Sequence, residues 1–166
     1  IGFEPYQNFL TNTGLKSLLQ LPGYFTTNIM SLIVLYFVTF HVVRSFDLDA
    51  MVPGLLSIVS FLILTPLGKA EIDGSALTFI SYDWIGTKGM FVSIIIGILV
   101  GRSYVFFIQN NITFKMPDSV PSFVEKSFAA LIPFFSITFV TAIIAWVMSL
   151  TKFGNIHEII YNVLQT

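Results

Sequence analysis

Four long stretches without a charged side chain constrain the fold of this chain more than any other feature. No Asp, Glu, Lys or Arg occurs at positions 17–43, 50–68, 89–101 or 127–151. The hydrocarbon core of a bilayer is about 30 Å thick and a helix rises about 1.5 Å per residue, so about 20 apolar residues span it. Because the stretches lack the alternation of apolar and polar residues that barrel strands show, they predict membrane-spanning helices.

The predicted spans have the approximate bounds 26–43, 51–67, 89–108 and 128–150. The second span is short and begins with Pro53-Gly54. Pro53 therefore falls in the first helical turn, where its missing N–H costs no helical hydrogen bond. The expected fold class is all-α, a polytopic membrane bundle of about four spanning helices with short amphipathic helices and a small hairpin or cap.

The composition agrees with a membrane protein and excludes several other classes. Of the 166 residues, 55% are hydrophobic and 10% are charged, whereas ordinary soluble domains carry about 25% charged residues. The absence of Cys excludes a disulfide scaffold, a cysteine-ligated zinc and a cysteine nucleophile. The formal net charge of −1 gives no reason to expect nucleic-acid binding.

The connection between the second and third predicted spans, from Gly68 to Lys88, is long for a loop without structure. Asp73-Gly74 lies within it and is typical of a type I′ turn between two short extended segments. This connection therefore predicts a small hairpin or cap on one face of the membrane.

Two flanking segments have the pattern of interfacial helices. Asn155 followed by Glu158 resembles a capping box at the start of a predicted helix over 155–165. One face of that helix is apolar and carries Ile156, Ile159, Ile160, Val163 and Leu164. The other face carries His157, Glu158, Asn162 and Gln165, so His157 needs no special role. A weaker amphipathic pattern, which ends at a break predicted at Pro22-Gly23, consists of Leu15, Leu18 and Leu19.

Small residues recur at every fourth position along the third predicted span and give the strongest packing signal in the chain. They are Gly89, Ser93, Gly97 and Gly101. Small residues let two helix backbones approach closely where lipid gives no hydrophobic drive for association. This spacing predicts a helix-packing seam, either within one protomer or between the protomers of a dimer. A looser seam on the fourth span consists of Thr141, Ala145 and Ser149.

Two ionisable residues lie inside the predicted spans. Arg102 lies within about two turns of a helix end, so it is either a gate, ligand or ion-pair residue, or its guanidinium reaches the headgroups. His41, in the last turn of the first span, either relays protons or binds substrate, or it hydrogen-bonds a neighbouring helix.

No organised catalytic or metal-binding motif accompanies these residues. The acidic pairs Asp47/Asp49 and Glu71/Asp73 lie in polar loops, which favours solvated positions over acid–base chemistry. The chain has no Walker loop, no Gly-x-Gly-x-x-Gly and no Gly-x-Ser-x-Gly. Its two histidines are far apart. The sequence therefore assigns no catalytic, cofactor-binding or metal-binding residue.

Three segments of the sequence together resemble a known family. They are Gly86-Thr87-Lys88-Gly89-Met90-Phe91, Met116-Pro117-Asp118-Ser119-Val120-Pro121 and Ser127-Phe128-Ala129-Ala130-Leu131-Ile132-Pro133. The chain is similar in these segments to the enzyme IIC permeases of the bacterial phosphoenolpyruvate-dependent phosphotransferase system, in their lactose/cellobiose/diacetylchitobiose family. The residues that carry the signature loop are Met116, Pro117, Asp118, Val120 and Pro121.

The resemblance implies a permease of the bacterial cytoplasmic membrane with two halves. The N-terminal half builds a homodimer interface, and the C-terminal half binds the disaccharide through a glutamate and a histidine. A phosphocysteine on the partner enzyme IIB, itself supplied by enzyme IIA, phosphorylates the sugar on the cytoplasmic side. Positions 1–166 would be the scaffold and dimerisation part, with the sugar-binding half absent, so no catalytic residue is carried over to this chain.

The count of basic residues on the two sides of the membrane is tied and predicts no orientation. The resemblance places the loops at Arg44–Asp49 and Met116–Pro121 in the cytoplasm, and the Gly68–Lys88 connection on the outer side.

Two other functions compete with the permease interpretation. The first is a self-contained small helical membrane protein, such as a channel subunit or an assembly scaffold. The second is a membrane enzyme that acts through Arg102 and the loop at Asp47/Asp49, which is weaker because no nucleophile or base is organised nearby.

Overall fold

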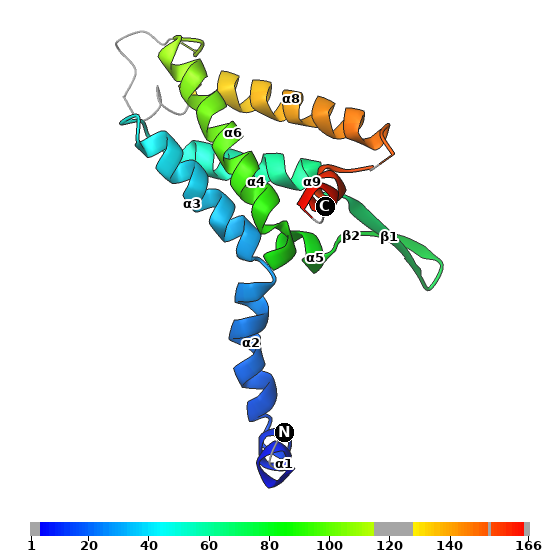
Figure 1. The fold of residues 1–166 in the computed structure, drawn as a ribbon. Helices are drawn as coiled ribbons and strands as arrows, with labels where there is room; N and C mark the ends of the chain where they lie inside the picture. The colour runs from blue at the N-terminus through cyan, green and yellow to red at the C-terminus, as the bar shows by residue number, and fades with distance from the viewer. Residues whose placement is uncertain (1–3, 115–127, 153, 165–166) are drawn as a thin grey trace.

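The computed structural model describes residues 4–114, 128–152 and 154–164. It consists of a helical bundle from which a helical arm and a β-hairpin project (Figure 1). The elements, in chain order, are α1 (Glu4–Asn12), α2 (Leu15–Thr27), α3 (Met30–Arg44), α4 (Met51–Leu64), β1 (Leu67–Ile72), β2 (Ser75–Ile80), α5 (Tyr82–Ile85), η1 (Thr87–Gly89), α6 (Met90–Gln109), α8 (Leu131–Ser149) and α9 (Ile156–Leu164).

The core lies where α3, α4 and α6 meet. The most extensive contact joins α3 and α6, while α4 packs against α3, α6 and α8. Fully buried side chains at the centre include Leu35 of α3, Leu56 and Phe61 of α4, and Val92 of α6. In contrast, α2 buries no residue and forms the arm that projects from the bundle in Figure 1.

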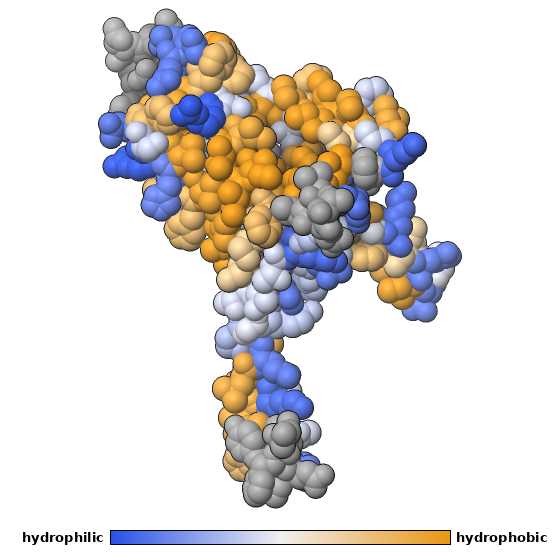
Figure 2. Space-filling model, viewed as in Figure 1, coloured by the Kyte–Doolittle hydropathy of each residue, from blue (hydrophilic) through white to orange (hydrophobic). Residues whose placement is uncertain are grey.

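Within the described part of the chain, two helices are long and apolar enough to cross a membrane, judged by length and composition. They are Thr87–Gln109, which joins η1 to α6, and Leu131–Ser149, which is α8. Their positions agree closely with the predicted spans 89–108 and 128–150. Figure 2 shows an apolar belt over the bundle between two hydrophilic ends, as a membrane protein requires.

The first two predicted spans differ from the observed helices. In place of a single helix over 26–43, α2 and α3 form a pair bent by 42°, which is long enough for a third span only if the pair counts as one. The second span, predicted to reach residue 67, ends at Leu64. Thr65 is extended because it precedes Pro66, and a residue before proline disfavours the helical conformation.

The predicted break at Pro22-Gly23 is wrong, because both residues lie inside α2. The Thr26 hydroxyl donates a hydrogen bond of 2.7 Å to the Pro22 carbonyl, within the turn that follows the proline. The chain bends later, at Asn28 and Ile29, where Asn28 ends α2 by donating its N–H to the Tyr24 carbonyl. Position alone did not distinguish a proline that ends a helix from one that a helix absorbs.

The hairpin predicted in the Gly68–Lys88 connection is confirmed. Strands β1 and β2 pair antiparallel, with Ile72 opposite Ser75 at the turn. Asp73 and Gly74 have φ values of 50° and 75°, and a type I′ turn requires positive φ at both central residues. Gly68 leaves room for the Phe79 ring, which lies across the strand pair where a side chain at 68 would stand.

The C-terminal amphipathic helix is also confirmed, as α9. The Asn155 side-chain oxygen accepts a hydrogen bond of 2.9 Å from the Glu158 N–H, so Asn155 caps this helix as predicted. Ile156 and Ile160 pack against the core of the bundle. This helix therefore lies against the bundle, next to the start of α6.

Candidate functional site: a helix seam and a buried histidine

The Gly-x-x-x-Gly motif of α6 faces α3 of the same chain. A Cβ built on Gly97 would lie 3.1 Å from Val38 Cγ1 and 3.2 Å from the Leu35 carbonyl oxygen. A Cβ on Gly101 would lie 2.9 Å from Val42 Cγ1. The two glycines thus allow the α3 and α6 backbones to touch, and α3 occupies the space beside them.

A hydroxyl reinforces this contact. Thr39 of α3 is fully buried, and its Oγ1 lies 2.9 Å from its own-helix Leu35 carbonyl and 3.2 Å from the Gly97 carbonyl of α6. The single Thr39 proton is shared between these two acceptors, so the hydroxyl bridges the helices at the point where glycine brings them together.

The other two members of the ladder have different neighbours. A Cβ on Gly89 would collide with the Trp84 carbonyl oxygen of α5. Ser93 is buried, and its hydroxyl donates to the Met90 carbonyl at 2.7 Å within its own helix. The ladder is therefore continuous in sequence but divided in space, with α3 beside Gly97 and Gly101 and α5 beside Gly89. The looser series on α8 is also divided, because Thr141 is buried and Ser149 is exposed.

The segment Gly86-Thr87-Lys88-Gly89 lies at a close junction of backbones. A Cβ on Gly86 would lie 2.8 Å from the Tyr82 carbonyl oxygen and 3.1 Å from the Thr27 carbonyl oxygen, which belongs to the end of α2. Near it, the Ser31 hydroxyl of α3 donates a 2.6 Å hydrogen bond to the Ile85 carbonyl. The signature loop Met116, Pro117, Asp118, Val120 and Pro121 lies outside the described residues.

Arg102 and His41 each lie beside an aromatic ring. Both side chains are exposed, and no hydrogen bond or ion pair holds either of them within the part of the chain that the structure describes. The Arg102 guanidinium lies 5.2 Å from the centre of the Phe46 ring, and the His41 ring meets the Phe40 ring edge-on at 5.8 Å. Among the described residues, no group of His, Asp and Glu could hold a metal ion.

The interpretation of His157 as a residue of the polar face is wrong. This side chain has no solvent exposure. Its ring lies 5.3 Å from that of Phe61 on α4 and 4.9 Å from that of Trp84 on α5. Tyr161, one turn further along α9, lies against Trp84 and donates a hydrogen bond to the Lys88 carbonyl. The residues Phe61, Thr65, Trp84, His157 and Tyr161 are called the His157 cluster below.

The hydrogen bonds of the cluster favour one tautomer of His157. The Thr65 hydroxyl donates its proton to the Phe61 carbonyl at 2.8 Å. This leaves the Thr65 oxygen to accept the 3.2 Å bond from His157, which favours the imidazole proton on Nε2. Nδ1 is left as a buried acceptor with no partner among the described residues. Burial lowers the pKa of His157 from 6.5 to about 4, so the ring is neutral at pH 7.

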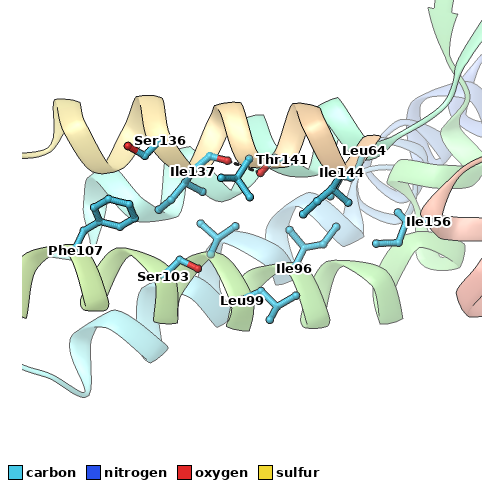
Figure 3. Close-up of a pocket in the computed structure, with 12 residues that line it drawn as sticks. Leu64, Ile96, Leu99, Ser103, Phe107, Ser136, Ile137, Thr141, Ile144 and Ile156 are labelled. Atoms are coloured by element: carbon cyan, nitrogen blue, oxygen red, sulfur yellow. Dashed lines mark hydrogen bonds between the residues drawn. The ribbon is translucent and has the colours of Figure 1, made fainter. Parts of the chain in front are cut away.

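A cavity of about 180 Å³ lies between α6 and α8 (Figure 3). Its lining is apolar apart from the hydroxyls of Ser103, Ser136 and Thr141. Thr141 uses its proton on the Ile137 carbonyl of its own helix, at 2.7 Å. No charged side chain lines the cavity, so it lacks the converging donors and acceptors with which a protein binds a sugar.

These features define the class of protein to which the chain belongs. The described part of the chain is a helical membrane bundle in which polar side chains such as Thr39 and His157 form hydrogen bonds between segments far apart in sequence.

The family model described as "Phosphotransferase system, EIIC" matches residues 1–166. The chain belongs to this family.

Relatives and a solved structure extend the similarity. The oligo-beta-mannoside-specific EIIC component of the phosphotransferase system of Bacillus subtilis (strain 168) is 36% identical over 97% of this chain and 38% of its own length. The cellobiose-specific EIIC component of Geobacillus stearothermophilus is 33% identical over 81% of this chain and 31% of its own length. The crystal structure of the transporter ChbC, the IIC component from the N,N'-diacetylchitobiose-specific phosphotransferase system, matches with a TM-score of 0.88 and 32% identity. That match covers 99% of this chain and 40% of ChbC. The chain thus spans well under half the length of each of these proteins.

Proposed function

We propose that this chain is part of a permease that imports a disaccharide of the cellobiose, diacetylchitobiose or lactose type while the sugar is phosphorylated. The observation that carries the proposal is the agreement of fold and sequence with ChbC over 99% of the chain. Relatives specific for oligo-beta-mannosides and for cellobiose support the same substrate class. The relatives are more than twice as long, which disfavours a self-contained small membrane protein.

Within such a permease, this segment acts as the scaffold. Its largest helix contact is closed by glycines and a shared hydroxyl, and its cavity offers hydroxyls but no charged side chain to a sugar. The disaccharide is bound elsewhere in the permease, and the phosphoryl group comes from the partner components IIB and IIA. The scaffold also carries the interface of a homodimer. The permease is a multi-pass protein of the bacterial cytoplasmic membrane, where lipid surrounds it.

A chimaera tests this division of labour. Residues 1–166 replace the matched 40% of ChbC, and phosphoenolpyruvate-dependent uptake of diacetylchitobiose is measured in cells that lack their own permease. We expect uptake with the sugar preference of the recipient, because the donated segment supplies packing surfaces and no sugar ligand. A matched chimaera with Gly97→Leu, whose scaffold cannot close, should show no uptake. A chimaera that reaches the membrane but acquires a different sugar preference would place sugar recognition in this segment.

The proposed orientation puts the Arg44–Asp49 loop in the cytoplasm and the hairpin outside. In the structure the C-terminal ends of α3 and α6 lie at one end of the bundle, while the hairpin and α9 lie toward the other (Figure 1). Residues 1–166 contain no Cys, so single thiols are introduced at Ser119 and Ser75, and the unsubstituted protein measures any background labelling. An impermeant reagent added to intact cells should modify the thiol at 75 and leave that at 119 unmodified. The reverse pattern would overturn this orientation.

A further inference from the structure

A single histidine side chain joins α9 to two other elements. His157 is fully buried between Phe61 on α4 and Trp84 on α5, and its one hydrogen bond crosses to Thr65, 92 residues away in sequence. The rest of the α9 contact consists of apolar side chains such as Ile156 and Ile160, and the hydrogen bond from Tyr161 to the Lys88 carbonyl. An imidazole is thus buried in an interface whose other contacts are largely apolar or aromatic.

The surroundings of His157 favour the neutral ring and oppose the charged one. Protonation would place a second N–H on Nδ1, which has no acceptor among the described residues. Helix α4 has no titratable residue, and the carboxylates of the other two elements, Asp83 of α5 and Glu158 of α9, are both exposed. Tyr161 uses its hydroxyl on the Lys88 carbonyl, and Tyr82 of α5 is exposed.

A cation lies against two aromatic rings of the His157 cluster. Lys88 Nζ lies 5.5 Å from the centre of the Trp84 ring and 6.0 Å from that of Tyr161, so it shares the aromatic surfaces that flank His157. A second positive charge in this cluster would be repelled and would lose its water. The imidazolium therefore has no stabilising partner while α9 is docked.

We propose that His157 makes the docking of α9 onto the ends of α4 and α5 dependent on pH, with the neutral ring holding the helix in place and the protonated ring releasing it. The inference concerns only the packing of α9 and stands whether or not the permease function is correct.

The direction of the pH dependence follows from the difference between the pKa of His157 in the released and docked states. When α9 is released, His157 meets water and recovers its ordinary pKa of 6.5, whereas the docked ring has a pKa of about 4. The released state therefore binds more protons between these two values, and docking weakens as pH falls through 6.5 until it levels off near 4. Between pH 7.5 and 5.5, these two values give a shift in the docking equilibrium of about tenfold.

Hydrogen exchange of the backbone amides in α9 measures this equilibrium directly, because exchange occurs from the released state. The chain is compared with His157→Phe, and if that variant folds poorly with His157→Gln, in lipid nanodiscs at pH 7.5 and 5.5. Comparison at equal pH removes the dependence of intrinsic exchange on pH. We expect the ratio of wild-type to variant exchange in α9 to rise about tenfold at pH 5.5, and the ratio in α6 to stay constant.

Two outcomes would overturn the proposal. One is a ratio in α9 that changes by less than about twofold between the two pH values. The other is a Glu158→Gln variant that loses the pH dependence, which would identify the neighbouring carboxylate as the titrating group. Retention of the full shift in Glu158→Gln, together with its loss in the non-titrating His157 variants, would support it.

Discussion

Helices α6 and α8 have the same mean hydropathy but differ in how much of each helix is buried. In α6, 44% of the most apolar 18-residue window is buried, whereas in α8 the share is 17%. Along α6, Gly97 and Gly101 allow α3 to pack closely. Along α8, large side chains such as Phe135, Phe139 and Trp146 point outward and remain more than 60% exposed.

The difference shows that the hydropathy of a membrane helix does not determine how closely it packs against other helices. Apolar character places a helix in lipid, but lipid solvates leucine and phenylalanine as well as another helix does. The position of small residues then decides which helix face meets protein. Helix α6 has both the apolar character and the small residues. Helix α8 has the apolar character, and its buried residues include Ile137 and Thr141.

The largest effect that would test this comparison is expected from Gly97→Leu. The new side chain would meet the Leu35 carbonyl and the Val38 side chain, and the carbonyl cannot turn aside without breaking α3. We expect a loss of about 3 kcal/mol in stability, at the upper end for an overpacked site, seen as a lower melting temperature in detergent. The closest change on α8, Ala142→Leu, introduces the same leucine side chain at an exposed position and should leave stability within about 0.5 kcal/mol. Equal losses in the two variants would remove the distinction between the helices.

A smaller effect is expected at Thr39. Thr39→Val keeps the shape of the side chain but removes the hydroxyl that bridges α3 to the Gly97 carbonyl. Loss of this bond should cost about 0.6–1 kcal/mol, measured by the same thermal unfolding. Thr141→Val is the matched change on α8, where the hydroxyl bonds only its own helix, and it should cost less. If Thr141→Val proves the more harmful, the hydroxyl at 39 does not hold the seam.

Local patterns in the sequence predicted much of this fold. The charge-free stretches locate α6 and α8 because the bilayer imposes a length on any helix that crosses it. The Asp73-Gly74 turn and the Asn155 cap were visible because each depends on a few adjacent residues. The spacing of Gly97 and Gly101 indicated a close helix contact but did not identify α3 as its partner.

Features that depend on distant residues were not predictable in the same way. His157 lies among polar neighbours in sequence, and only the meeting of α9 with Thr65 and Trp84 turns its side of the helix inward. The sequence does contain a signal for this burial, since Ile156, His157, Ile160 and Tyr161 share one helical face. The bend after α2 and the early end of α4 likewise depend on how the chain continues.

The shortness of α4 bears on how well this part of the bundle blocks leakage across the membrane. Fourteen residues of helix extend about 21 Å, which is about 9 Å less than the hydrocarbon core. Beyond Leu64, Thr65 and the aromatic rings of the His157 cluster lie at the end of the helix. If α4 crosses the bilayer, the barrier at this end is completed by side chains from three separate elements and not by one continuous helix.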